Sequence, residues 1–356
     1  MERYEHGGDT YMHGEVRLDF SVNINPLGMP EQVREAIATH IAEYQRYPDP
    51  YCRALREAIA RHENVAAEDI LCGNGAADLI YRLCLSLRPK RMLVLAPTFS
   101  EYERAALLAG AEVLFHRLRE ENGFALTERI LDDITADVDM VFLCNPNNPT
   151  GQLAEPELME RISVRCMEAG ALLIVDECFL SFTRGISCKS FLQTYPDIVI
   201  LDAFTKLYAM AGVRLGHIIT KNHGVLSKAQ AFGQCWSVSA VAQAAGLAAL
   251  ECHEYVRETQ QLVAAERAYL AGSFEKLGLQ VFPGCANYIL FKSEKPLLAT
   301  LLKKGLFIRS CGNYEGLDRQ FYRVCVMQRK QNEELVREIT KVLRGIPAKE
   351  GVEFED

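Results

Sequence analysis

The sequence predicts an α/β fold in which a large domain with a mostly parallel sheet is followed by a smaller α+β domain. From about residue 30 to residue 220, short apolar runs alternate with segments of helical periodicity, as in parallel sheets covered by helices on both faces. After residue 250 the pattern changes to a long charged helical segment and then short strands. We therefore expect an N-terminal arm over 1–28 that closes over an active site, a large domain over 29–250, a small domain over 251–346 and a polar tail over 347–356.

The elements of both domains follow from the spacing of apolar residues. Val33, Ile37 and Ile41 fall on one face of a helix, and Leu79 and Leu83 fall on one face of another. The apolar runs predict strands of the large domain at 70–72, 92–95, 112–115, 140–144, 172–175 and 198–201. For the small domain we expect a helix over 254–274, strands at 280–282, 288–291, 307–309 and 322–326, and a last helix near 332–343.

Composition excludes several classes of protein. The formal net charge is -8, so the chain lacks the basic surface expected of a nucleic-acid-binding protein. The twelve cysteines include no Cys-x-x-Cys pair, which argues against a zinc site and favours buried thiols in a reducing compartment. Residues 1–6 form no apolar signal core, and no apolar run is long enough to span a bilayer. We expect a cytoplasmic protein without membrane contact.

The segment 73–78 (Gly-Asn-Gly-Ala-Ala-Asp) follows an expected strand and opens an expected helix. Small residues at such a turn let backbone N–H groups and the helix N-terminus approach an anion. A Gly-x-Gly turn also occurs in dinucleotide-binding sites. Those sites require an acidic residue at the end of the next strand, where this chain has Ala96 and Pro97. We interpret the segment as a phosphate-binding turn, with a plain tight turn as the alternative.

Polar residues also stand at the ends of later strands, where open α/β sheets bind their ligands. Asn148 lies in the Pro-rich segment 145–151, which could simply be a loop. Asp176 could hold and protonate a heterocyclic nitrogen, although a turn cap agrees with its position equally well.

Lys206 follows an apolar strand and stands beside Thr205, whereas an isolated lysine is normally a solvated surface residue. Burial lowers the pKa of a lysine from its free value of about 10.4 and favours the neutral amine that Schiff-base chemistry needs. Arg214 stands eight residues later and can bind a phosphate through two guanidinium nitrogens.

Together the phosphate-binding turn, Asn148, Asp176, Lys206 and Arg214 form an ordered set, with spacings of 28, 30 and 8 residues from Asn148 onward. In this order and spacing the chain resembles the fold-type I enzymes that depend on pyridoxal 5'-phosphate (PLP), close to the histidinol-phosphate aminotransferases, from about residue 6 to residue 343. The resemblance implies the aspartate aminotransferase fold and PLP as the cofactor. It also implies that Lys206 holds PLP as a Schiff base, that Asp176 pairs with its ring nitrogen and that Asn148 binds its ring hydroxyl.

Further positions match the same family. Phe99 matches the ring that stacks on the cofactor, and Arg323 matches the arginine that binds the substrate α-carboxylate. Tyr47 resembles the tyrosine that reaches the cofactor phosphate of the neighbouring subunit, which implies a homodimer. The phosphate-binding positions of the family match Gly75, Ala76, Ala77, Thr205 and Arg214.

Four segments resemble the threonine-phosphate decarboxylases, which convert L-threonine O-3-phosphate to (R)-1-amino-2-propanol O-2-phosphate in cobalamin biosynthesis. These segments are 6–8 (His-Gly-Gly), 19–28, 236–238 (Trp-Ser-Val) and 309–317. The resemblance implies that His6 and its neighbours bind the substrate phosphate. It also implies a small-molecule substrate site completed by Asn25, Arg309, Asn313 and Arg323.

Several positions depart from these families. Phe179 stands where many of the aminotransferases have a tyrosine, so Asn148 would be the main polar partner of the ring hydroxyl. Four other changes are expected to surround the substrate pocket, at Asp9, His217, Ser239 and Met327. They leave the PLP assignment intact and keep histidinol phosphate, phosphoserine and phosphonate amino acids open as substrates.

Three functions remain open from the sequence. They are the decarboxylase, a PLP-dependent aminotransferase acting on a phosphorylated or phosphonate amine, and a PLP-binding protein without catalysis. Arg323 argues against the third, because such a protein has no need of a substrate arginine. His6 and His13 could bind a metal, but no carboxylate or cysteine stands at ligand spacing, so we expect none. Trp236 could be a core aromatic, and His6 could be a disordered terminal residue.

Overall fold

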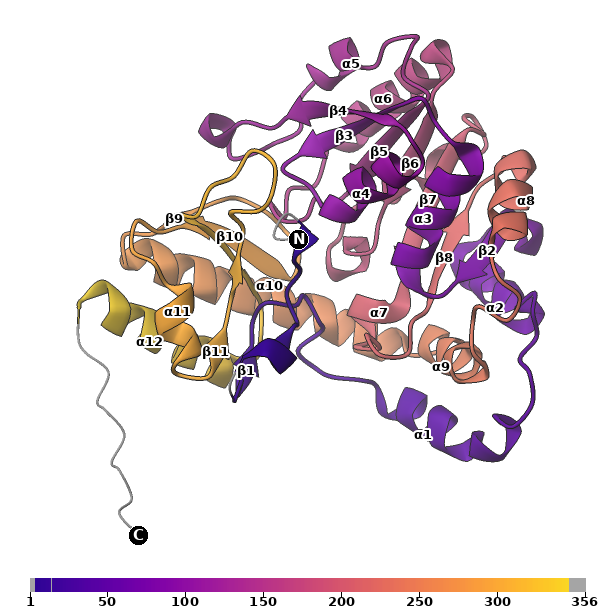
Figure 1. The fold of residues 1–356 in the computed structure, drawn as a ribbon. Coiled ribbons are helices and arrows are strands. Elements are labelled where there is room, and N and C mark those ends of the chain that lie inside the picture. Colours follow the sequence, from indigo (N-terminus) through magenta and orange to yellow (C-terminus); the bar gives the residue numbers. More distant parts are fainter. Residues whose placement is uncertain (1–3, 14, 346–356) are drawn as a thin grey trace.

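The computed structural model describes residues 4–13 and 15–345, which form a large sheet, a smaller sheet and a two-stranded sheet (Figure 1). The buried hydrophobic residues form two clusters. The large sheet has seven strands in the order β2-β8-β7-β6-β5-β3-β4. The pairs β3–β4, β3–β5, β5–β6 and β6–β7 are parallel, so the predicted mostly parallel α/β sheet is confirmed. Its strands are β2 (Ile70–Gly73), β3 (Arg91–Ala96), β4 (Glu112–Arg117), β5 (Met140–Cys144), β6 (Leu172–Asp176), β7 (Ile198–Ala203) and β8 (Gly216–Ile219).

Helices flank this sheet and connect its parallel strands (Figure 1). Each crossover helix returns the chain to the same edge of the sheet, so successive strands end on the same side. The helices are α1 (Glu31–Thr39), α2 (Arg53–Glu63), α3 (Gly75–Leu87), α4 (Ser100–Leu108), α5 (Ile130–Asp133), α6 (Pro156–Ala169), α7 (Phe204–Leu207), α8 (His223–Phe232) and α9 (Ala240–Leu250).

Strand β8 is the strand of the large sheet that the sequence pattern did not predict. It is antiparallel to both of its neighbours, β2 and β7. Its four residues include a glycine and a histidine, so the apolar run is too short to indicate a strand. A Cβ at Gly216 would lie 2.8 Å from the backbone nitrogen of Ala76. Glycine therefore lets β8 pass close to the start of α3.

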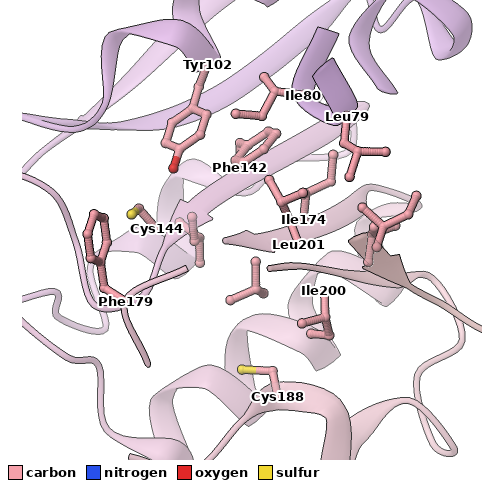
Figure 2. Close-up of a cluster of buried hydrophobic side chains, with 14 of the residues drawn as sticks. Leu79, Ile80, Tyr102, Phe142, Cys144, Ile174, Phe179, Cys188, Ile200 and Leu201 are labelled. Carbon is pink, nitrogen blue, oxygen red and sulfur yellow. The ribbon is translucent and has the colours of Figure 1, made fainter. Parts of the chain in front are cut away.

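The core of the large domain lies directly beneath the ends of its central strands. Tyr102, Phe142 and Ile174 are all 0% exposed, and Figure 2 shows them packed around β5 and β6. The rings of Tyr102 and Phe142 stack with their centroids 4.2 Å apart. Burying a side chain of this size contributes about 1.5–3 kcal/mol. Side chains at the ends of these strands are therefore supported by a well-packed hydrophobic core.

The small domain contains a four-stranded antiparallel sheet in the order β12-β13-β10-β9. The prediction of one strand over 307–309 is wrong, because the chain changes partner at Ile308. β11 pairs in parallel with β1 of the N-terminal arm, and β12 joins the four-stranded sheet. The elements are β1 (Leu18–Asp19), α10 (His253–Lys276), β9 (Gln280–Val281), β10 (Tyr288–Lys292), α11 (Leu298–Leu302), β11 (Leu306–Phe307), β12 (Arg309–Ser310), β13 (Phe321–Cys325) and α12 (Arg329–Leu343).

Three further properties bear on the expectations from sequence. Within the described ranges, no helix is both long and apolar enough to cross a membrane. All twelve cysteines are free thiols, and ten of them are buried. The expected polar tail, 347–356, lies outside the described residues.

Candidate active site

A cavity of about 260 Å³ lies at the carboxyl ends of β3, β5, β6 and β7, where the large domain, the small domain and the N-terminal arm meet. Gly75, Asn25, Asn313 and Tyr47 are not among its lining residues. The cavity does bring together most of the residues singled out from the sequence: His6, Ala76, Ala77, Phe99, Asn148, Asp176, Thr205, Lys206, Arg214, Arg309 and Arg323.

The phosphate-binding turn is built where β2 ends and α3 begins. Gly75 has a φ of +82°, and a Cβ at this position would lie 2.6 Å from Nη2 of Arg214. Glycine is therefore needed both for the backbone conformation and for the close approach of the guanidinium. The backbone N–H of Asn74 donates to Oδ2 of Asp78 at 2.8 Å, which fixes the turn. The N-terminus of a 13-residue helix and a guanidinium thus face the same space, as an anion requires.

Asp176 ends β6 and is buried beneath the cavity. Burial raises the pKa of its carboxyl group, although hydrogen bonds from Cys178 and Tyr102 oppose this effect. The Tyr102 hydroxyl donates to Oδ2 at 2.7 Å, and the backbone N–H of Cys178 donates to Oδ1 at 3.0 Å. A cationic nitrogen placed beside this carboxylate would oppose the effect of burial and stabilise its ionised form. Sequence reasoning missed Tyr102, whose only signal is its position three residues after Phe99.

Lys206 lies in the short helix α7, directly after β7. Burial lowers the pKa of its amine to about 8, and repulsion from Arg323 acts in the same direction. Lys206 lines the cavity, and among the described residues no hydrogen bond or ion pair engages its Nζ. A neutral amine is therefore accessible near neutral pH, as the covalent chemistry of a carbonyl cofactor requires.

Asn25, which the resemblance assigned to the substrate site, lies against the turn that carries Lys206. Asn25 is only 3% exposed and lies outside the cavity. Its backbone N–H donates to the carbonyl of Lys206 at 3.1 Å, and its Nδ2 donates to the carbonyl of Leu207 at 2.7 Å. Nδ2 also lies 2.7 Å from Oγ1 of Thr259. Because these bonds use its amide, Asn25 fixes the turn that carries the lysine.

Arg323 lies on β13 and reaches the cavity from the small domain. Its guanidinium donates to Oδ1 of Asn148, to the Tyr314 hydroxyl at 3.4 Å and to the carbonyl of Ser21 at 2.7 Å. Its Nε is buried and has no hydrogen-bond partner among the described residues. The guanidinium is therefore oriented by three separate segments and retains hydrogen-bonding capacity for a carboxylate.

The N-terminal arm crosses the cavity and brings His6 into it. Nε2 of His6 lies 2.6 Å from Oε1 of Glu101, and its ring centroid lies 5.4 Å from that of Phe99. The carbonyl of Glu5 accepts hydrogen bonds from Arg309 and, at 3.0 Å, from Nδ2 of Asn313. Asn313 therefore lies in an adjoining groove and holds the arm. Sequence reasoning missed Glu101.

The two glycines after His6 have a steric role. A Cβ at Gly7 would lie 2.3 Å from the carbonyl oxygen of Ser21, and Gly8 has a φ of +87°. The backbone N–H of Gly8 donates to Oγ of Ser21 at 2.8 Å. The His-Gly-Gly segment can therefore lie against the chain at Ser21 only because both positions lack a side chain.

Tyr47 and Trp236 lie at the surface, away from the cavity of their own chain. Tyr47 is 79% exposed and Trp236 is 45% exposed, and their rings stack with centroids 4.4 Å apart. The alternative that Trp236 is a core aromatic is therefore wrong. The role inferred for Tyr47 requires a second chain.

The positions that depart from the family pattern lie mostly elsewhere than expected. Phe179 lines the cavity and packs edge-on against Tyr288 with centroids 5.0 Å apart, so no hydroxyl stands at this point. None of the four other changed positions lines the cavity, although Asp9 lines the adjoining groove: Asp9, His217, Ser239 and Met327. His217 is instead buried in β8, where burial lowers its pKa to about 3.

Comparison with known proteins gives the family. Residues 15–339 match the family described as aminotransferase class I and II. The chain belongs to this family. Since the match spans both domains, the predicted fold-type I architecture is confirmed, and the chain is a PLP-dependent enzyme.

The proteins to which the chain is similar have two different activities. The chain is similar to the threonine-phosphate decarboxylase of Salmonella typhimurium, with 39% identity over 334 residues and coverage of 92% of each chain. It is also similar to the histidinol-phosphate aminotransferase of Symbiobacterium thermophilum, with 35% identity over 341 residues, covering 93% of this chain and 91% of the relative. The crystal structure of the histidinol-phosphate aminotransferase from Clostridium acetobutylicum matches with a TM-score of 0.87 at 32% identity, covering 92% of this chain and 100% of that one.

The residues of the cavity fit PLP. The turn at Ala76 and Ala77 with Arg214 provides an anion site for its phosphate. The buried carboxylate of Asp176 lacks a cationic partner among the described residues, and a protonated ring nitrogen would supply one. Lys206 offers an amine with a lowered pKa on the same side of the sheet.

Proposed function

We propose that this enzyme decarboxylates L-threonine O-3-phosphate to (R)-1-amino-2-propanol O-2-phosphate and CO2. The proposal rests on two basic positions in the cavity besides the phosphate-binding turn. Arg323 provides one for an α-carboxylate, and His6 with Arg309 provides another for a second anionic group. A substrate that carries both a carboxylate and a phosphate satisfies both positions. The 39% identity to the Salmonella decarboxylase supports this choice.

The side chains that line the cavity would have different roles in the reaction. When bound, PLP supplies a ring that accepts the electron pair released when a bond at the substrate Cα breaks. Asp176 would keep the ring nitrogen protonated, and Lys206 would hold the cofactor and later deliver a proton to Cα. Arg323 and His6 would bind the two ends of the substrate. Holding both ends determines which Cα bond stands perpendicular to the ring and therefore breaks.

An aminotransferase acting on histidinol phosphate or another phosphorylated or phosphonate amino compound is the second candidate. The 35% identity to a histidinol-phosphate aminotransferase favours it. The same residues would serve, except that Lys206 would then move a proton away from Cα. Phe179 favours the decarboxylase, since many of the aminotransferases it resembles carry a tyrosine there.

A phosphorus NMR time course distinguishes the two candidates. PLP-loaded protein is incubated with L-threonine O-3-phosphate, with and without 2-oxoglutarate. We expect conversion to aminopropanol phosphate at the same rate in both samples, accompanied by release of CO2. Turnover that requires 2-oxoglutarate, or no turnover of this compound, would replace the decarboxylase with the aminotransferase.

We further propose a cytoplasmic homodimer, acting in cobalamin biosynthesis, in which Tyr47 of each chain reaches the cofactor site of the other. The exposure of the stacked Tyr47 and Trp236 rings supports a second copy at this surface. Twelve free thiols agree with a reducing compartment. Light scattering of the holoenzyme should give twice the chain mass of 40.0 kDa. A monomeric, fully active enzyme would contradict the role of Tyr47.

A further inference from the structure

A buried carboxylate stands beside the position proposed to bind the substrate phosphate. Glu101 lies in the first turn of α4 and is only 7% exposed. By itself, this negative charge would repel a phosphate bound at His6. Its presence therefore needs a physical explanation.

Both oxygens of Glu101 are engaged. Oε1 lies 2.6 Å from Nε2 of His6, and Oε2 accepts a hydrogen bond of 2.5 Å from the Tyr81 hydroxyl. Burial alone would raise the pKa of Glu101, but the hydrogen bonds from His6 and Tyr81 outweigh it and hold the pKa below its usual value. The carboxylate is therefore ionised, and its closest polar partner in the cavity is the imidazole.

A carboxylate bonded to one imidazole nitrogen fixes the orientation of the ring. Because Glu101 engages Nε2, Nδ1 is the nitrogen that remains for a ligand. The His6 ring is also held beside Phe99, the ring expected to stack on the cofactor.

The other charged groups around His6 are mostly cationic. Arg104 lies on the same helix as Glu101, with 3.6 Å between its Nη1 and Oε1. Arg309 of the small domain and Arg214 of the phosphate-binding turn line the same cavity. Glu101 therefore fixes the imidazole within the cavity that these cations line.

We propose that Glu101 is a positioning residue that keeps the His6 ring oriented in the cavity, and so gives the cavity its preference for a substrate with a phosphate group. This inference rests on the proposed function only in taking the substrate to be phosphorylated. It holds for decarboxylation and for transamination alike.

Glu101→Gln tests the proposal because it keeps the size of the side chain and removes its charge. With L-threonine O-3-phosphate we expect KM to rise about tenfold or more, because an amide oxygen holds the His6 ring less firmly than a carboxylate does, with at most a twofold change in kcat. Binding of the same compound to the holoenzyme, measured by calorimetry, should weaken by a similar factor. Binding of unphosphorylated L-threonine should change less than twofold. Equal losses for both compounds would overturn the proposal.

Three further variants separate positioning from general damage. Glu112→Gln removes an exposed acid on β4 that pairs with Arg91, and should leave all constants unchanged. Tyr81→Phe keeps the charge of Glu101 and should cost less than Glu101→Gln. Adding Glu101→Gln to His6→Ala should cause no further loss, because Glu101 acts through His6. Additive losses would overturn the proposal.

The binding data also separate this inference from the proposed reaction. If the enzyme transaminates but Glu101→Gln still weakens only the phosphorylated ligand, the reaction is wrong and the inference stands. If CO2 is released at an unchanged KM in Glu101→Gln, the inference is wrong and the reaction stands. A wild-type enzyme that binds L-threonine as tightly as its phosphate would refute the inference.

Discussion

The two sides of the cavity are built in different ways. The side proposed to hold the cofactor, called the cofactor side (Ala76, Ala77, Asp176, Lys206 and Arg214), comes from one sheet, and its residues follow strand ends or adjoin them. The side proposed to bind the substrate, called the substrate side (His6, Arg309 and Arg323), comes from the arm and the small domain. There, the hydrogen bond between Arg309 and the Glu5 carbonyl joins residues 304 positions apart. Cofactor chemistry can thus stay constant while contacts at the other side change the substrate.

The largest expected effect on turnover comes from a substitution on the cofactor side. Lys206→Ala should lower turnover by at least about a thousandfold, because no other lysine in the described part of the chain lines the cavity where the cofactor would be held and the proton moved. Borohydride reduction should then no longer fix PLP to the chain, as seen by mass spectrometry. Lys228→Ala, on the exposed face of α8, is the control. A reducible linkage in the Lys206 variant would assign the cofactor to another lysine.

Arg323→Ala should impair substrate recognition on the substrate side and leave cofactor binding on the cofactor side unchanged. We expect kcat/KM to fall about a hundredfold, because truncating a buried charged group leaves its partners unpaired at a cost of about 2–5 kcal/mol. Bound PLP should keep its visible spectrum and its affinity. An active variant would place carboxylate recognition elsewhere, and loss of PLP would mean that the two sides are not separable.

Gly75→Ala should weaken cofactor binding without altering the chemistry. A Cβ at this position would lie 2.6 Å from Nη2 of Arg214, and the φ of +82° disfavours any side chain. We expect the Kd for PLP to rise about tenfold, with kcat at saturating PLP within twofold, because the turn would move away from the guanidinium. Gly212→Ala is a matched control, since a Cβ there meets nothing within 4 Å. Equal Kd values for the two variants would contradict the steric argument.

The smallest expected effect is that of the Arg323 charge, on the substrate side, on the pKa of Lys206, on the cofactor side. The pKa of Lys206 is lowered to about 8 by burial and then by Arg323. Since the neutral amine reacts with PLP, recombination of the apoenzyme should accelerate as the pH rises through about 8. Arg323→Gln removes one repelling cation and should move the midpoint to higher pH, which stopped-flow absorbance can measure. An unmoved midpoint would mean that burial alone sets the pKa of Lys206.

The different construction of the cofactor side and the substrate side also explains which features could be predicted from the sequence. The strands with long apolar runs were predictable, and so were the polar residues that follow them, because a parallel sheet places successive strand ends at one edge. β8 was missed because four residues with a glycine and His217 carry no strand pattern. On the substrate side, no spacing indicates that Glu101 meets His6 across 95 positions, or that Asn25 supports the lysine turn instead of the substrate.

The segment from Leu18 to Asn25 connects the two sides mechanically. Leu18 pairs with Leu306 of the small domain, and the backbone N–H of Asn25 is bonded to the carbonyl of Lys206. Between them, the Ser21 carbonyl accepts from Arg323 at 2.7 Å. Eight residues leave little slack, since an extended chain gains only about 3.3–3.6 Å per residue. This short segment therefore joins the small domain, the Arg323 guanidinium and the backbone of Lys206 within eight residues.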